Sequence, residues 1–229
     1  MRSYGRRHGK PLRANRQALV DDLLPRLRVD PSAHAPGTLD PRALFDARPR
    51  RVWLEIGFGG GEHLAAQAAA HPDVGLIGCE PFMNGVAALL ARVDEGGLTA
   101  NLRLLDDDAR RLLAALAPAS LDRVFILFPD PWPKTRHHKR RLINPATLDA
   151  LARVLADGAE LRFASDHKAY MSWALERLTA HPAFAWTARR AADWRARPAD
   201  GMATRYEEKA LARGETCTYL TFRRRPRGG

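Results

Sequence analysis

The sequence predicts an α/β domain in which helices cover both faces of a parallel sheet. Short apolar runs alternate along the chain with helical segments of about 10–15 residues, a pattern typical of βαβ units. The run LDRVFILF (121–128) is apolar almost throughout, as expected for a strand that is buried on both faces. These two observations favour a parallel sheet over a sandwich or a helical bundle.

The order of the elements follows from the same patterns. Strands are expected at 51–56, 75–80, 101–105, 121–128, 159–164, 184–188 and 216–222, and helices at 62–71, 84–95, 109–117, 145–156 and 168–180. Asn144 and Pro145 have the pattern of an N-cap followed by proline at the first helical position, and Asp157-Gly158 is expected to end that helix. A polar loop is expected between the last two strands. Ligands of parallel sheets lie at the carboxyl ends of the strands, so the residues that follow each strand are candidates for a site.

Length and composition exclude several classes of protein. The chain has 229 residues, of which 45% are hydrophobic, so it is neither disordered nor a collagen-like repeat nor a disulfide miniprotein. No apolar run approaches the roughly 18–20 residues of a membrane helix, and the basic start has no apolar core or cleavage site of a secretory signal. Cys79 and Cys217 lack metal-type spacing, which suits a reducing cytoplasm.

Positive charge is concentrated in three short segments. The net charge is +11, and residues 1–16, 134–141 and 223–227 together contribute fifteen basic and no acidic residues. The remainder has 22 basic and 26 acidic side chains. Such a localised positive surface indicates a polyanionic partner, although solvated charge is the alternative, above all for the tail 223–227.

A glycine-rich turn follows the first strand. In LEIGFGGG (54–61), Gly57 and Gly59 stand where a ligand could approach the backbone closely. A dinucleotide fingerprint would need a further glycine where the chain has Glu62. A tight turn without a ligand is the alternative.

Acidic residues follow the second and third strands. Glu80 is placed to bind ribose hydroxyls, and one of Asp106, Asp107 and Asp108 could accept from an adenine amino group. The alternatives are a solvated strand-end acid for Glu80 and a helix N-cap for an aspartate of the run. Acidic walls around an adenosine favour S-adenosylmethionine, which carries positive groups, over the anionic NAD.

The loop after the fourth strand is the most distinctive segment. Asp130 lies among three prolines beside Trp132, and the basic run KTRHHKRR (134–141) follows. A carboxylate in a stiffened loop beside an aromatic ring and cations suits a flipped base and its phosphates. A rigid surface loop with solvated charges is the alternative. His137 and His138 have no further ligand at metal spacing, so no metal site is expected.

The sequence resembles the bacterial tRNA (guanine-N7-)-methyltransferase family over about residues 50–222, most specifically in FPDPWPK and RHHKRRL. The resemblance implies a class I, Rossmann-like methyltransferase fold with a seven-stranded, mostly parallel sheet whose last strand is antiparallel. It also implies S-adenosylmethionine as cofactor and methylation of guanosine N7 in the variable loop of tRNA. Tyr4–Arg7 is similar to a mobile leader of the family. A segment 1–30 that is mobile without RNA, followed by one domain over 31–229, is therefore expected.

The roles of individual residues carry over by motif. The resemblance implies cofactor-binding acids at Glu55, Glu80 and Asp108, the last because Asp108-Ala109 matches the family's Asp-Ala pair, and a catalytic aspartate at Asp130. It implies tRNA-binding positions at Lys134, Asp166, Thr204, Arg205, Tyr206 and Glu207. Arg136, Lys139, Arg140 and Arg141 are expected to contact tRNA phosphates.

Two alternatives to this function stay open. The chain could methylate another RNA or a small molecule, or it could be a non-catalytic RNA-binding protein on a methyltransferase fold. A cytoplasmic protein that is a monomer or a homodimer, with no metal and no membrane partner, is expected in each case.

Overall fold

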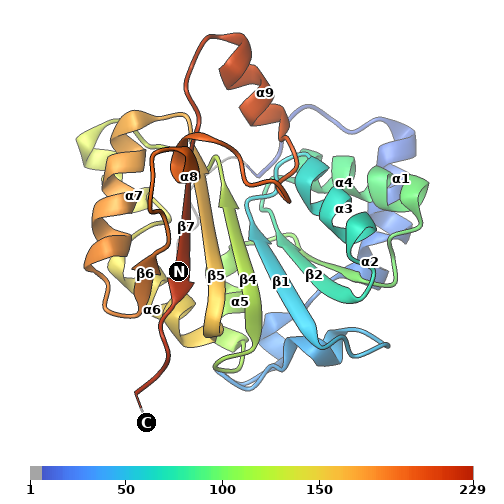
Figure 1. The fold of residues 1–229 in the computed structure, drawn as a ribbon. Coiled ribbons are helices and arrows are strands. Elements are labelled where there is room, and N and C mark those ends of the chain that lie inside the picture. Colours follow the sequence, from blue (N-terminus) through green and yellow to red (C-terminus); the bar gives the residue numbers. More distant parts are fainter. Residues whose placement is uncertain (1–6, 229) are drawn as a thin grey trace.

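The computed structural model describes residues 7–228 and shows one seven-stranded sheet between two layers of helices (Figure 1). The strands are β1 (Arg51–Ile56), β2 (Val74–Cys79), β3 (Leu102–Leu105), β4 (Leu121–Leu127), β5 (Leu155–Ser165), β6 (Phe184–Trp186) and β7 (Thr218–Arg224). They lie in the order β3-β2-β1-β4-β5-β7-β6. Only β7 runs against its neighbours, β5 and β6, which confirms the expected mostly parallel sheet with an antiparallel last strand.

The helices that connect the strands bury an apolar face against the sheet. They are α3 (Glu62–Ala70), α4 (Met83–Gly96), α5 (Ala109–Ala115), α6 (Pro145–Val154) and α7 (Lys168–Ala180). Alternate residues of β1 point to opposite faces. Val52 and Leu54 pack in the core with α5, α6 and α7, whereas Trp53 packs with α3 and α4. Among the described residues, none of the helices has both the length and the apolar character that crossing a bilayer requires.

Helix α6 begins where the sequence predicted and ends earlier. The side chain of Asn144 accepts from Thr147 N, which confirms the N-cap. The expected end at Asp157-Gly158 is wrong, because β5 already starts at Leu155. The pairing of β4 with β5 shifts register after Leu121, and Gly158 has a φ of 80° that accommodates the irregularity.

The expected polar loop before the last strand contains two helices, α8 (Ala192–Arg195) and α9 (Arg205–Ala212). Helix α9 exposes charged side chains together with Tyr206 and Leu211, and of its residues only Glu207 and Ala210 are buried. Helix α9 lies above the ends of the strands (Figure 1). The stretch expected to be a loop therefore supplies a cover for the site.

The segment that precedes the first strand is packed on the domain. Its helices are α1 (Ala14–Asp22), which lies beside α4, and α2 (Leu24–Leu27). Leu23, Leu24 and Leu27 are buried in the core of α3 and α4. The same segment contains two short 3-10 helices, Pro31–Ala33 and Pro41–Leu44, and a third, Thr135–Arg140, lies after β4. Residue 30 therefore does not mark an edge of this core, and mobility of the segment without RNA stays a prediction. Most of Tyr4–Arg7 lies outside the described residues.

Candidate active site

The glycine-rich turn joins β1 to α3 and exposes its backbone. Gly57 has a φ of 77°, and a Cβ added there would meet nothing within 4 Å. Gly59 has a φ of 56°, and an added Cβ would lie 2.9 Å from the ring of Tyr206. The turn thus leaves open space at Gly57 for a ligand, while α9 closes over Gly59.

Two adjacent hollows lie at the carboxyl ends of β1, β2 and β4. Both are lined by Ile56, Gly57, Pro81, Pro129, Asp130 and Leu142. The first extends to Asp108, Trp132 and Arg140, and the second to Gly59, Glu80 and Tyr206. Asp130 stands where the two meet, so a ligand of two unlike halves could fill both and pass this carboxylate.

Glu80 follows β2 and is almost buried. Its carboxylate accepts from Gly59 N and Phe82 N, each at 2.9 Å, and so ties the glycine turn to the start of α4. Burial raises the pKa of Glu80, the nearby charges of Asp130 and Glu55 raise it further, and the two backbone hydrogen bonds oppose them. A positively charged ligand group would relieve this crowding of negative charge.

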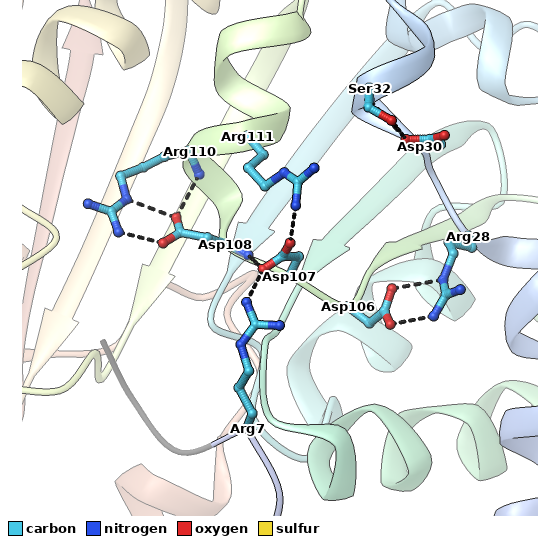
Figure 2. Close-up of polar contacts among 9 residues, drawn as sticks. All are labelled: Arg7, Arg28, Asp30, Ser32, Asp106, Asp107, Asp108, Arg110 and Arg111. Carbon is cyan, nitrogen blue, oxygen red and sulfur yellow. Dashed lines mark hydrogen bonds and ion pairs between the residues drawn. The ribbon is translucent and has the colours of Figure 1, made fainter. Parts of the chain in front are cut away.

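Two of the three aspartates after β3 are occupied by surface arginines. Arg28 donates to both oxygens of Asp106, at 2.9 and 2.5 Å. Asp107 lies 2.5 Å from Arg7 and 2.6 Å from Arg111. Figure 2 shows that Arg7 and Arg28 come from the N-terminal segment, whereas Arg111 comes from α5. Neither carboxylate lines the hollows.

Asp108 is the one aspartate of the run that lines a hollow. It is also the N-cap of α5, accepting from Arg110 N at 3.0 Å, and it pairs with the Arg110 guanidinium at 2.5 Å (Figure 2). Although burial acts in the opposite direction, these hydrogen bonds hold the pKa of Asp108 below its usual value. Asp108 is therefore both the N-cap of α5 and the aspartate that faces the first hollow.

Glu55 is a buried carboxylate beneath the turn. One oxygen lies 2.7 Å from Nδ1 of His63, whose side chain is equally buried. Glu55 does not line either hollow. Its contact with a cofactor stays a prediction.

The loop that carries Asp130 is tightly shaped. Phe128 and Trp132 have positive φ angles of 51° and 43°, which are strained for side-chain-bearing residues. The Asp130 side chain is exposed at the hollows, yet the loop removes enough water from the carboxyl to raise its pKa. No side chain among residues 7–228 makes a hydrogen bond or ion pair with it. The carboxylate is thus held by backbone geometry and is open to a substrate.

Arg141, unlike the other cations of the basic run, is buried. Its side chain is 2% exposed, and its guanidinium lies 5.0 and 4.8 Å from the ring centres of Tyr170 and Trp173 of α7. Arg141 Nε donates to the carbonyl of Pro131 at 2.8 Å. These rings and this carbonyl enclose much of its side chain, although Arg141 also lines the first hollow. The expected contact of Arg141 with a tRNA phosphate stays a prediction.

Of the remaining cations of the basic run, Arg140 lines the first hollow. Lys134, Arg136 and Lys139 are exposed. Arg140 is half-buried, with its guanidinium 4.9 Å from the Trp132 ring centre. This run therefore presents three open charges beside a stacked arginine and indole.

In the segment Thr204–Glu207, two side chains are buried and two are exposed. Thr204 caps α9 by accepting from Glu207 N at 3.1 Å, and both side chains are buried. Arg205 and Tyr206 are exposed, and Tyr206 alone of the four lines a hollow. The sequence motif therefore serves first to start α9 above the glycine turn.

Glu207 and Asp166 have partners within the chain. Glu207 accepts from Tyr219 Oη at 2.5 Å and lies 3.2 Å from Arg197 Nε, in a separate apolar pocket beneath α9. Asp166, at the end of β5, pairs with Arg213 at 3.4 Å. Roles of Lys134, Asp166 and Thr204–Glu207 in substrate binding stay predictions.

Sequence reasoning missed two kinds of residue near the site. A Cβ on Gly85 in α4 would lie 2.3 Å from the carbonyl oxygen of Gly59, so this glycine allows the helix to touch the turn. A glycine inside a helical pattern was the available signal. Nothing in the local sequence marked Arg197, whose partner Glu207 comes from the next helix. Among residues 7–228 no three His, Cys, Asp or Glu side chains are grouped to hold a metal ion.

Solved structures with a similar fold include two methyltransferases of 16S rRNA. The 16S rRNA methyltransferase KamB matches with a TM-score of 0.56 at 15% identity, covering 84% of this chain and 99% of that one. A variant of the 16S rRNA (adenine(1408)-N(1))-methyltransferase from Catenulisporales acidiphilia, with the cosubstrate SAM, matches with a TM-score of 0.55 at 21% identity, covering 88% and 94%. At these identities the likeness shows the class I methyltransferase fold.

Sequence relatives are far closer. The family model described as a putative methyltransferase matches residues 49–220. The tRNA (guanine-N(7)-)-methyltransferase of Rhodospirillum rubrum is 58% identical over 99% of this chain and 89% of its own length. That of Paramagnetospirillum magneticum is 53% identical over 99% and 94%. These matches confirm the resemblance, and the chain belongs to the tRNA (guanine-N(7)-)-methyltransferase family.

Proposed function

We propose that this protein uses S-adenosylmethionine to methylate guanosine N7 in the variable loop of tRNA. The observation that carries the proposal is the position of Asp130, an open carboxylate at the meeting point of two hollows and beside an exposed basic run. Family membership supplies the substrate and the reaction. A cytoplasmic location follows from this substrate, while a monomeric or dimeric state stays a prediction.

The residues of the hollows fit the cofactor. S-adenosylmethionine carries a positive sulfonium and amine, and it supplies an electrophilic methyl group. Glu80 and Asp108 would hold its ribose and adenine, and the open backbone at Gly57 leaves room for close approach. Burial and the nearby carboxylates raise the pKa of Glu80, and a cationic ligand would favour its charged form.

Asp130 would position the guanine rather than remove a proton. Guanine N7 has a free lone pair and carries no proton, so methylation there needs no general base. A carboxylate can accept from the N–H groups of the opposite edge of the base and can offset the positive charge that develops on the ring. The strained Phe128–Trp132 loop keeps that carboxylate in place before substrate arrives.

The decisive test is Asp130→Asn. The amide keeps the shape but loses the negative charge, so turnover should fall by about 10²-fold or more, for a loss of about 3 kcal/mol in the transition state. Methyl transfer from labelled cofactor to bulk tRNA is the measurement. Asp149→Asn, a change at an exposed position of α6, is the control.

Mapping the methylated nucleotide separates the remaining functions. N7-methylguanosine in the variable loop supports the proposal, and methyl groups in another RNA point to a different substrate. Near-normal turnover of Asp130→Asn would refute the role of Asp130. Tight tRNA binding without transfer would identify a non-catalytic RNA-binding protein.

A further inference from the structure

A buried chain of hydrogen bonds crosses α3 beneath the glycine turn. His63 and Gln67, one helical turn apart, are each 2% exposed. Nδ1 of His63 lies 2.7 Å from the Glu55 carboxylate, and Nε2 of His63 lies 3.3 Å from Nε2 of Gln67. Gln67 Nε2 also donates to the backbone carbonyl of Asp200 at 2.9 Å. The chain therefore joins the strand below the site to the loop that leads into α9.

The direction of each hydrogen bond can be deduced. A backbone carbonyl only accepts, so the nitrogen of the Gln67 amide must face Asp200. The same nitrogen faces Nε2 of His63, which must therefore accept. The ring proton is then on Nδ1 and is donated to Glu55. One protein carbonyl thus fixes the tautomer of a histidine that holds a carboxylate beneath the site.

The glutamine is placed for these two donations. Its Oε1 is buried and has no hydrogen-bond partner among the described residues. An unpaired buried acceptor is unfavourable, and an apolar side chain of similar size would avoid it. The contribution of Gln67 therefore lies in joining His63 to Asp200.

The loop end of the chain is firmly anchored. The Asp200 carboxylate pairs with Arg162 at 2.7 Å and with Arg123 at 3.1 Å, and hydrogen bonds from Arg162 lower its pKa below the usual value. Four residues later Thr204 starts α9, which bears Tyr206 over Gly59. A shift of Asp200 would therefore be passed to the helix that covers the hollows.

We propose that His63 and Gln67 are positioning residues that couple cofactor binding at the β1 end to the loop 197–204 and α9, and so to tRNA. The inference rests on the proposed function, because it takes the ligands to be S-adenosylmethionine and tRNA. Glu55 does not line the hollows, but its charge acts on Glu80, which does. A cation bound at Glu80 therefore also attracts Glu55, and the hydrogen-bond chain through His63 and Gln67 then orders the loop for the RNA.

Hydrogen exchange of the full-length protein tests the coupling. In the wild-type protein, S-adenosylmethionine should slow amide exchange in residues 197–204 by about 10-fold, since a coupled loop opens less often. Gln67→Met keeps the unbranched length without donors. In this variant the amides of the loop should exchange faster, and adding the cofactor should not change their exchange rate. Gln17→Met, at an exposed position of α1, is the matched control and should behave as wild type.

Kinetics separate coupling from a loss of structure. Gln67→Met should raise KM for tRNA by about 10-fold, while the Kd for cofactor by calorimetry and the melting temperature change little. The inference would be overturned if bound cofactor did not change the exchange rate of residues 197–204 in the wild-type protein. It would also be overturned if the cofactor still slowed exchange of this loop in Gln67→Met. Neither result would contradict methyl transfer. Failure of the wild-type protein to bind S-adenosylmethionine would instead refute the proposed function.

Discussion

The ionisation of Glu80 sets the charge that the cofactor meets. Its pKa is raised above the ordinary 4.5, so on acidification it takes up a proton earlier than an exposed glutamate. Burying the charged form of Glu80 lowers the stability of the folded protein. The stability that the neutral form contributes is fully present below pH 4.5, and it is lost as the pH rises through the raised pKa. A cationic ligand prefers the charged form and offsets that cost.

Cofactor affinity should therefore fall on the acid side, beginning at a pH above 4.5. Calorimetry of S-adenosylmethionine binding across this range measures the effect. Glu80→Gln should bind weakly and should lose most of the pH dependence. A wild-type affinity that stays constant down to pH 4.5 would contradict the role of Glu80.

Arg141 supports the Asp130 loop through the Pro131 carbonyl. Arg141→Lys keeps the charge but loses the planar group between two rings and the Nε donor, so the loop should relax. We expect kcat to fall by about 10-fold or more, because small displacements at a reacting centre are costly.

The salt dependence of tRNA binding provides the contrast. Lys139→Ala removes an exposed charge and should lower the salt slope by about 1, whereas Arg141→Lys should leave the slope unchanged. A lower slope for Arg141→Lys, with normal kcat, would show that Arg141 contacts a phosphate instead of supporting the loop.

At the scale of elements, α4 and the glycine turn form one unit. Gly85→Ala would place a Cβ 2.3 Å from the Gly59 carbonyl oxygen, so the turn or the helix must move. We expect about a 10-fold weaker Kd for S-adenosylmethionine by calorimetry, since the turn borders both the ligand and Glu80. Gly96→Ala, near the other end of α4, meets only the flexible Leu98 side chain and is the control. Equal affinities of the two variants would show that the contact is unimportant.

The elements that the sequence predicted well are those that bury apolar residues at regular spacing. Strand β4 and helix α6 are examples, because apolar burial and an Asn144 cap are local signals. Helix α9 escaped prediction since it buries only Glu207 and Ala210. Its position depends on tertiary contacts that the local pattern does not contain.

The site shows the same division. Asp130 could be predicted because prolines and a strand end mark it locally. Arg140 and Arg141 are identical neighbours in the sequence, and only the rings of α7, some thirty residues away, decide that one is stacked at the hollow and the other enclosed. Likewise, of three consecutive aspartates, the position of α5 selects Asp108 for the hollow.

In the molecule as a whole, the positive charge has two roles. The basic run 134–141 is expected to bind tRNA, whereas arginine side chains of the tail 223–227 stabilise the fold. Arg227 donates to the carbonyls of Ala152, Arg153 and Leu155 at the end of α6, at 3.2, 2.9 and 2.7 Å, and pairs with Asp157. The carbonyl of Ala152 also accepts from Arg224 Nε, and that of Arg153 also accepts from Ala119 N. Arg227 therefore adds a second donor at a helix end whose carbonyls have no partner within the helix.

Arg227→Ala should lower the free energy of unfolding by about 1–2 kcal/mol, measured with denaturant, because several hydrogen bonds are lost. The salt slope of tRNA binding should not change. Arg223→Ala, at a 59% exposed side chain with one ion pair at 3.6 Å, is the control and should cost less. If Arg227→Ala left the free energy of unfolding unchanged, the tail would be only solvated charge.

The place of β7 also affects how the chain is made. This last strand lies between β5 and β6 and supplies the pairing that joins β6 to the sheet. On a ribosome, residues 218–224 leave the exit tunnel after all the other strands of the sheet. The half of the sheet that contains β4, β1, β2 and β3 can form before β7 emerges, whereas β6 gains its partner only afterwards. A truncated product would therefore expose the edge of β5 and leave β6 unpaired, which makes such products prone to aggregation.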